Sequence, residues 1–125
     1  VPVGRYTLTF LNNAANDAAF GETFRAGVMA NIVSYENNVK SVLTKVVLDE
    51  ADAGIVYHSD LTGPAVDQLG SIDIPDHLNI TAAYTVAPLK SSAHPDLAQD
   101  FIDFVLSEAG QEIIKENGLL PAKSE

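Results

Sequence analysis

The sequence predicts an α/β fold in which helices cover both faces of a mixed β-sheet. Two observations lead to this prediction. Segments with apolar residues at helical spacing alternate with short apolar runs that are rich in β-branched residues, and glycine or proline separates many of them. Such alternation is typical of a sheet packed between helices. At 125 residues the chain is long enough for one ordinary domain with a hydrophobic core.

The N-terminal third of the chain has the most ambiguous pattern. In residues 5–10, RYTLTF, apolar and polar side chains alternate as they do in a strand. However, Tyr6, Phe10 and Leu11 would also lie on one face of a helix. Residues 20–35 show weak helical spacing. The pattern alone leaves strand and helix open for residues 5–10.

A helix, a tight loop and a buried strand are predicted for residues 38–57. Asn37 or Asn38 is a suitable N-cap. Apolar residues follow at helical spacing, at Val39, Val42, Leu43, Val46 and Val47. Gly54 closes the loop, and residues 55–57 then form a short apolar strand. Because open α/β sheets bind ligands beyond the carboxyl ends of their strands, the polar residues from Tyr57 to Asp60 mark a candidate site.

Two more strands and two helices are predicted for the second half. Residues 61–71 form a loop with some helical character, residues 72–75 a short strand and residues 78–90 a longer one. The strongest helical pattern begins at Pro95, with Ser92 or His94 as its cap. Its apolar stripe consists of Leu97, Phe101, Phe104, Val105 and Leu106. A second helical segment carries Ile113 and Ile114 and stops at Asn117-Gly118.

The composition excludes several classes of function. With 17 acidic and 7 basic residues the net charge is −10, so neither nucleic acid nor an acidic membrane surface is an expected partner. A small anion is not excluded, because backbone N–H groups can hold it without lysine or arginine. There is no cysteine, which rules out disulfides and thiolate chemistry. The chain begins with Val1 rather than Met, so we expect a piece of a longer polypeptide.

No arrangement of residues predicts an enzyme. His58, Ser59 and Asp60 are adjacent, so in an extended chain they cannot converge as a catalytic triad, and capping of the loop by Ser59 and Asp60 is the better interpretation. The histidines do not have the spacing of metal ligands, and no metal site is expected. The carboxylate groups at residues 49–52 and 73–76 are interpreted as solvated surface rather than as a pair facing one cleft.

Three blocks together resemble the C-terminal part of the molybdate- and tungstate-binding proteins of ABC transporters. They are VPVGRY at residues 1–6, NNVKSVLTKVVLDEADAGIVYHSD at 37–60, and the stretch from IPDHLN to KENG at 74–118. The middle block is the most specific, and the last is shared more widely among extracytoplasmic solute-binding proteins. The resemblance covers nearly the whole chain and favours a helix from about Gly4 onward.

The resemblance implies a specific site and ligand. The family closes a two-lobed type 2 periplasmic-binding-protein fold on molybdate or tungstate. By position, Val3 and Val39 match backbone N–H donors at helix starts, and Tyr57 matches a tyrosine whose hydroxyl reaches the anion. Uncharged donors favour a fully ionised oxyanion over protonated phosphate. No cofactor is expected, and molybdenum or tungsten enters only as the oxyanion.

The resemblance also implies a domain division, partners and a location. Residues 1–82 would form most of the second lobe, and residues 83–125 a crossover strand and C-terminal helices that return to the first lobe. The apolar stripe would then be covered by the remaining half of the protein, by a second copy or by residues 1–82. The expected role is that of the substrate-binding component of an ABC importer, which delivers its ligand to a membrane permease. The expected location is periplasmic or extracytoplasmic, and the protein could be held at the membrane by a lipid anchor.

Two other function classes stay open at this point. A regulator could use the same fold as a ligand-sensing effector domain, and a DNA-binding motif upstream would favour it. An enzyme with Tyr57 or His58 as acid or base is the weakest alternative, because the sequence has no nucleophile motif or phosphate loop.

Overall fold

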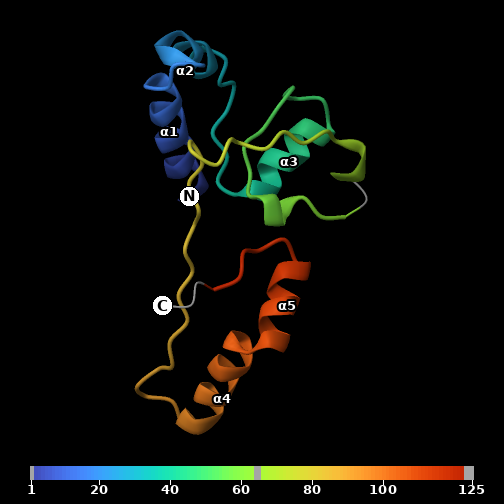
Figure 1. Cartoon of the computed structure of the whole chain (residues 1–125). Coiled ribbons are helices and arrows are strands. Elements are labelled where there is room, and N and C mark those ends of the chain that lie inside the picture. The colour runs from blue at the N-terminus through green and yellow to red at the C-terminus, as the bar shows by residue number, and fades with distance from the viewer. Residues whose placement is uncertain (1, 64–65, 123–125) are drawn as a thin grey trace. The chain divides into compact units, whose positions relative to one another are not determined.

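The computed structural model describes residues 2–63 and 66–122 (Figure 1). The described residues form five α-helices and two short 3₁₀ turns. The chain divides into two compact units, Val1–Thr81 and Ala82–Glu125. The first unit holds α1, α2, α3 and both 3₁₀ turns, and the second holds α4 and α5. The assignment of these units to the lobes of a binding protein stays a prediction.

The first helix, α1 (Pro2–Ala15), settles the ambiguity in the N-terminal segment. Pro2 is its first residue, where a missing N–H costs nothing. Val3, Leu11 and Ala14 recur at helical spacing and are all buried, so one face of α1 packs into the first unit. Residues 5–10 are therefore helical, as the resemblance implied, although the helix begins two residues earlier than expected.

The second helix, α2 (Gly21–Ala30), lies beside α1 in the first unit (Figure 1). Gly21, the first residue of α2, has φ of +73°, a left-handed conformation that suits glycine where the chain enters the helix. Arg25 joins the two helices, because its Nε donates to Asn12 Oδ1 over 3.0 Å. The same guanidinium also pairs with Glu22 at 2.8 Å.

The third helix, α3 (Val39–Val47), begins where the sequence predicts. Asn38 has an extended backbone, and its Oδ1 accepts a hydrogen bond from the Ser41 N–H over 2.9 Å. This is the expected N-cap interaction. The 3₁₀ turns η1 (His58–Asp60) and η2 (Val66–Gln68) follow later in the first unit. The predicted helical character of residues 61–71 corresponds to η2, although Pro64 and Ala65 lie outside the described residues.

The core of the first unit is small and centres on α1. Leu11 is 1% exposed, and Leu78, which lies far along the chain, is 3% exposed. Asn13 Nδ2 donates to the carbonyl oxygen of Leu78 over 3.3 Å. The turn at residues 76–78 is thereby fastened to α1, and it draws the neighbouring residues of the chain to this helix.

The second unit consists mainly of α4 (Pro95–Leu106) and α5 (Glu108–Glu116), joined at Ser107. Pro95 is the first residue of α4, as predicted, but neither His94 nor Ser92 caps the helix with its side chain. Ser107 caps α5 by accepting from the Gly110 N–H over 3.2 Å. Gly118 follows α5 with φ of +75°, which confirms the predicted stop.

The predicted α/β fold with a mixed sheet is wrong for this structure. None of the described residues forms a β-strand, and residues 55–57, 72–75 and 78–90 run extended or in turns without a ladder. A helix pairs its own backbone groups, whereas a strand needs another strand beside it. An alternating pattern predicts which side chains of a strand would be buried and which exposed. It does not show that a second strand is available to pair with it.

Candidate functional site

Val3 lies in the first turn of α1. Its amide is one of the first four N–H groups of the helix, which have no acceptor within the helix. The side chain is 8% exposed, so packing into the core holds the position of this amide. The Thr7 hydroxyl donates to the Val3 carbonyl oxygen over 2.9 Å and tightens the same turn. No acidic side chain lies in the first turn, where one would oppose an anion.

Val39 is the first residue of α3. The Asn38 cap occupies the Ser41 N–H and fixes the direction in which the helix starts. The Val39 amide is then among the N–H groups that the helix leaves unpaired. The first turn of α3 also contains no acidic residue. Both predicted backbone donors therefore lie at helix starts with the partial positive charge that favours an anion.

Tyr57 stands where the extended segment 54–56 meets η1. Its N–H donates to Asp60 Oδ2 over 3.2 Å, and its carbonyl oxygen accepts from the Asp60 N–H over 3.0 Å. The capping role predicted for Asp60 is thus confirmed, while that of Ser59 stays a prediction. Asp60 orders the loop that presents the Tyr57 ring, rather than taking part in a catalytic triad.

Gly54 brings this loop close to α3. A Cβ atom at this position would lie 2.5 Å from Val42 Cγ1 and 3.3 Å from Val46 Cγ2. Only a residue without a side chain permits so close an approach. The loop that leads to Tyr57 is therefore packed on the helix that begins with Val39, and two of the three predicted site residues lie on directly packed segments.

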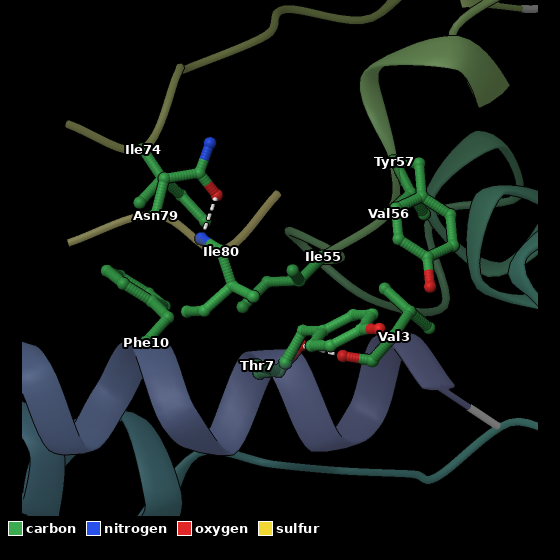
Figure 2. A pocket seen from close by; sticks show the side chains of 10 residues that line it. Val3, Thr7, Phe10, Ile55, Val56, Tyr57, Ile74, Asn79 and Ile80 are labelled. Carbon is green, nitrogen blue, oxygen red and sulfur yellow. Dashed lines mark hydrogen bonds between the residues drawn. The ribbon is translucent and has the colours of Figure 1, made fainter. Parts of the chain in front are cut away.

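A small pocket brings Val3 and Tyr57 together. It has a volume of about 40 Å³ and lies between one face of α1, the segment before η1, and the chain near residues 74–80 (Figure 2). Ten residues line it: Val3, Tyr6, Thr7, Phe10, Ile55, Val56, Tyr57, Ile74, Asn79 and Ile80. Val39 is not among the lining residues. In Figure 2 the Tyr57 ring lies near Val3, at the first turn of α1.

Among the residues that the structure describes, none that lines this pocket carries a charge. This is notable in a chain with a net charge of −10. Two groups with shifted pKa values, Asp17 and Lys45, lie outside the lining. The carboxyl of Asp17 has its pKa lowered, chiefly by the Ala19 N–H, and the ammonium of Lys45 has its pKa raised, chiefly by Glu50. The described part of the lining therefore presents neutral polar groups and apolar walls, without a carboxylate that would repel an anion.

Tyr6 is one of several lining residues that the sequence analysis did not single out as part of the site. Its ring centroid lies 6.5 Å from that of Tyr57, with an interplanar angle of 65°, which is an edge-to-face arrangement. The signal that could have found it is its spacing. Tyr6 comes three residues after Val3, so both fall on one face of α1.

A second pocket lies around η1 and η2, lined by His58, Leu61, Val66, Asp67, Leu69, Gly70 and Ser71. It contains none of the three predicted site residues. Within residues 2–63 and 66–122, no group of three or more histidine or acidic side chains could hold a metal ion. In the same part of the chain, no helix is long and apolar enough to cross a membrane.

Comparison with known proteins places these features in a family. A family model described as "Bacterial extracellular solute-binding protein" matches residues 1–120. Proteins named "Molybdate-binding protein ModA" from Mycobacterium bovis and from two strains of Mycobacterium tuberculosis are 36% identical over 92 residues. That alignment covers 74% of this chain and 35% of each relative. The chain thus spans about a third of the length of these curated relatives.

No solved structure matches the chain. The family assignment rests on sequence, and it confirms the resemblance to solute-binding proteins. It also agrees with the expectation of a binding protein rather than an enzyme.

Proposed function

Because the chain belongs to the bacterial extracellular solute-binding proteins, we propose that it forms part of a receptor for a tetrahedral oxyanion, molybdate or tungstate. The receptor would deliver its ligand to the permease of an ABC importer. The observation that supports this most directly is the pocket. Val3 and Tyr57 line the same small cavity, its described lining residues are all uncharged, and the relatives at 36% identity are named for molybdate binding.

Each of the three residues has a distinct part in this proposal. The amides of Val3 and Val39 donate hydrogen bonds at the positive ends of α1 and α3, where the helix dipole adds about 0.3–1 kcal/mol for a negative ligand. The Tyr57 hydroxyl donates a third hydrogen bond. A valine can serve because only its N–H is required, and its apolar side chain fixes that N–H by packing.

The neutral donor set also determines which anions bind. A fully ionised oxyanion accepts every hydrogen bond that such a site offers. Phosphate carries a proton near neutral pH, and a donor site has no acceptor to meet it. Molybdate and tungstate should therefore bind much more tightly than phosphate, and sulfate must be distinguished by size.

The family description favours a receptor over a regulator, because the matched family is extracellular. The expected place of action is the periplasm or the outer face of the cytoplasmic membrane. A lipid anchor is the finer part of this proposal. Mass spectrometry of the protein isolated from membranes would test it, since a lipid-modified N-terminus has a characteristic added mass.

The apolar stripe of α4 supports a proposal about partners. Leu97, Phe101 and Phe104 are 65%, 61% and 50% exposed. Contiguous apolar patches rarely stay open to water in a stable protein. We propose that another protein surface, either a second copy or a further part of the receptor, covers this stripe. Light scattering that finds a monomer, together with rapid solvent labelling of the stripe, would contradict the proposal.

Calorimetric titration of the full-length protein that contains this chain tests the ligand. Molybdate and tungstate are expected to bind tightly, with sulfate and phosphate weak. Tyr57→Phe should weaken binding about ten-fold or more, because a hydrogen bond to a charged group is worth about 1.5–3 kcal/mol. Tyr35→Phe is the matched control, since Tyr35 is 78% exposed and lies outside the pocket lining.

The outcomes separate the parts of the proposal. Binding of none of the four anions would remove the ligand. Tight binding that Tyr57→Phe leaves unchanged would keep the ligand but remove the hydroxyl from the site.

A further inference from the structure

Tyr6 and Tyr57 come from different kinds of structure. Tyr6 lies in the second turn of α1, a helix that buries Val3 and Leu11 in the core. Tyr57 stands at the end of an extended segment, just before a 3₁₀ turn of three residues. A ring on a packed helix is held more firmly than a ring on a loop. The contact between the two rings therefore connects a fixed element to a more adaptable one.

The contact has the geometry of a specific aromatic pair. The centroids are 6.5 Å apart and the rings are inclined by 65°, within the range that edge-to-face pairs prefer. Both rings line the pocket, and Tyr6 follows Val3 by one helical turn. The helix that offers the Val3 amide thus also holds the ring against which Tyr57 rests.

We propose that Tyr6 is a positioning residue that orients the Tyr57 ring, and with it the hydroxyl, toward the oxyanion. This inference rests on the proposed function. By resting on α1, the Tyr57 hydroxyl keeps a defined position relative to the Val3 amide. Such preorganisation raises affinity because less conformational freedom is lost when the ligand binds.

The proposal assigns the effect to the ring of Tyr6 rather than to its hydroxyl. Tyr6→Phe keeps the ring and should preserve oxyanion affinity to within about two-fold. Tyr6→Leu removes the aromatic edge while keeping an apolar side chain of good helix propensity. It should weaken binding about two- to ten-fold, the range that corresponds to loss of one aromatic pair.

A double-mutant cycle in the full-length protein provides the decisive test. Molybdate affinity is measured for Tyr6→Leu, Tyr57→Phe and the double variant. If Tyr6 acts through the Tyr57 hydroxyl, Tyr6→Leu has little further effect once Tyr57→Phe has removed that hydroxyl. Equal losses in both backgrounds would overturn the proposal, as would a wild-type affinity in Tyr6→Leu.

Nuclear magnetic resonance of the wild-type protein keeps the test independent of variant folding. Nuclear Overhauser effects between the ring protons of Tyr6 and Tyr57 should be present and should persist when molybdate is added. Their absence with ligand bound would overturn the proposal. If instead Tyr57→Phe itself leaves the affinity unchanged, it is the role of the hydroxyl in the proposed function that fails.

Discussion

His77 Nε2 lies 3.1 Å from Asp17 Oδ2, and this pair joins two segments that are 60 residues apart in the sequence. Asp17 follows the end of α1, and His77 lies in the turn whose Leu78 enters the core. The Asn13 amide holds the same turn by its hydrogen bond to the Leu78 carbonyl oxygen. Together these contacts set the position of the chain that supplies Ile74, Asn79 and Ile80 to the pocket.

The first prediction concerns pH. The pKa of Asp17 is lowered from its ordinary value of 3.8, chiefly by the Ala19 N–H and also by His77. A carboxyl whose pKa is lower in the folded state stabilises the fold above the unfolded pKa and loses that effect as pH falls through the folded pKa. Asp17→Asn should therefore be less stable than wild type at pH 6.

This difference between Asp17→Asn and wild type should shrink once the pH falls below 3.8, the ordinary value of the carboxyl. Urea unfolding at pH 6 and at several values under pH 4 measures it. A difference that stays constant across this range would show that the ionised carboxylate is not the stabilising species.

The second prediction tests the core of the first unit. Leu11 is 1% exposed, whereas Leu8 in the same helix is 46% exposed. Leu11→Ala should lower the free energy of unfolding by about 2–5 kcal/mol, because it leaves a cavity at a fully buried position of the core. Leu8→Ala is the matched control and should change it by about 0.5 kcal/mol or less. Similar losses from both variants in denaturant titrations would argue against α1 facing the core as described.

The third prediction concerns the junction between α4 and α5. Gly110 is buried, and a Cβ atom there would collide with the carbonyl oxygen of Phe104 and lie 2.7 Å from that of Val105. These are backbone atoms, which cannot rotate out of the way as the end of a flexible side chain can. Gly110→Ala should therefore destabilise the protein by about 1–3 kcal/mol, in the range of overpacked sites.

Gly27→Ala is the control for this substitution. Gly27 lies in α2, and no neighbouring atom is within 4 Å of the position that a Cβ atom would take there. Alanine is the better helix former, so this change should stabilise the protein by about 0.5–1 kcal/mol. Thermal unfolding followed by circular dichroism compares the two. Stabilisation by both would show that α5 does not approach α4 this closely.

The fourth prediction separates the stability of α3 from its proposed anion site. Asn38→Ala removes the side-chain oxygen that accepts from the Ser41 N–H, and it should cost about 1 kcal/mol of stability. Asn38→Asp keeps the acceptor and should leave stability near that of wild type, but its charge next to Val39 should weaken molybdate binding. Denaturant titration and calorimetry measure the two effects. Unchanged affinity in Asn38→Asp would remove Val39 from the site.

The helices were largely predictable because their signals are local. The Asn38 cap, the proline that starts α4 and the Asn117-Gly118 stop all act within a few residues of the helix end. Residues 5–10 lacked such a signal, and pattern alone left them open. The burial of Val3, Leu11 and Ala14 along one face is what makes residues 5–10 part of a helix rather than a strand.

The strands were not predictable because pairing is not a local property. Residues 78–90 have the composition of a strand, but a strand is stable only beside a partner that accepts its hydrogen bonds. The structure provides no ladder among the described residues, and Tyr84 and Leu89 are about three-quarters exposed, at 76% and 75%. An apolar run is therefore evidence of where a segment could be buried, not of what buries it.

By itself, the sequence determined most of the helices, the uncharged character of the candidate donors and the family to which the chain belongs. Those properties depend on residue type, spacing and order along the chain. Only the tertiary structure decided that Val3 and Tyr57 line one pocket, that Val39 is not among its lining residues, and that Tyr6 contacts Tyr57. The physical reason is that these relationships depend on long-range packing: Leu78 enters the core beside α1, and the loop at Gly54 lies against α3.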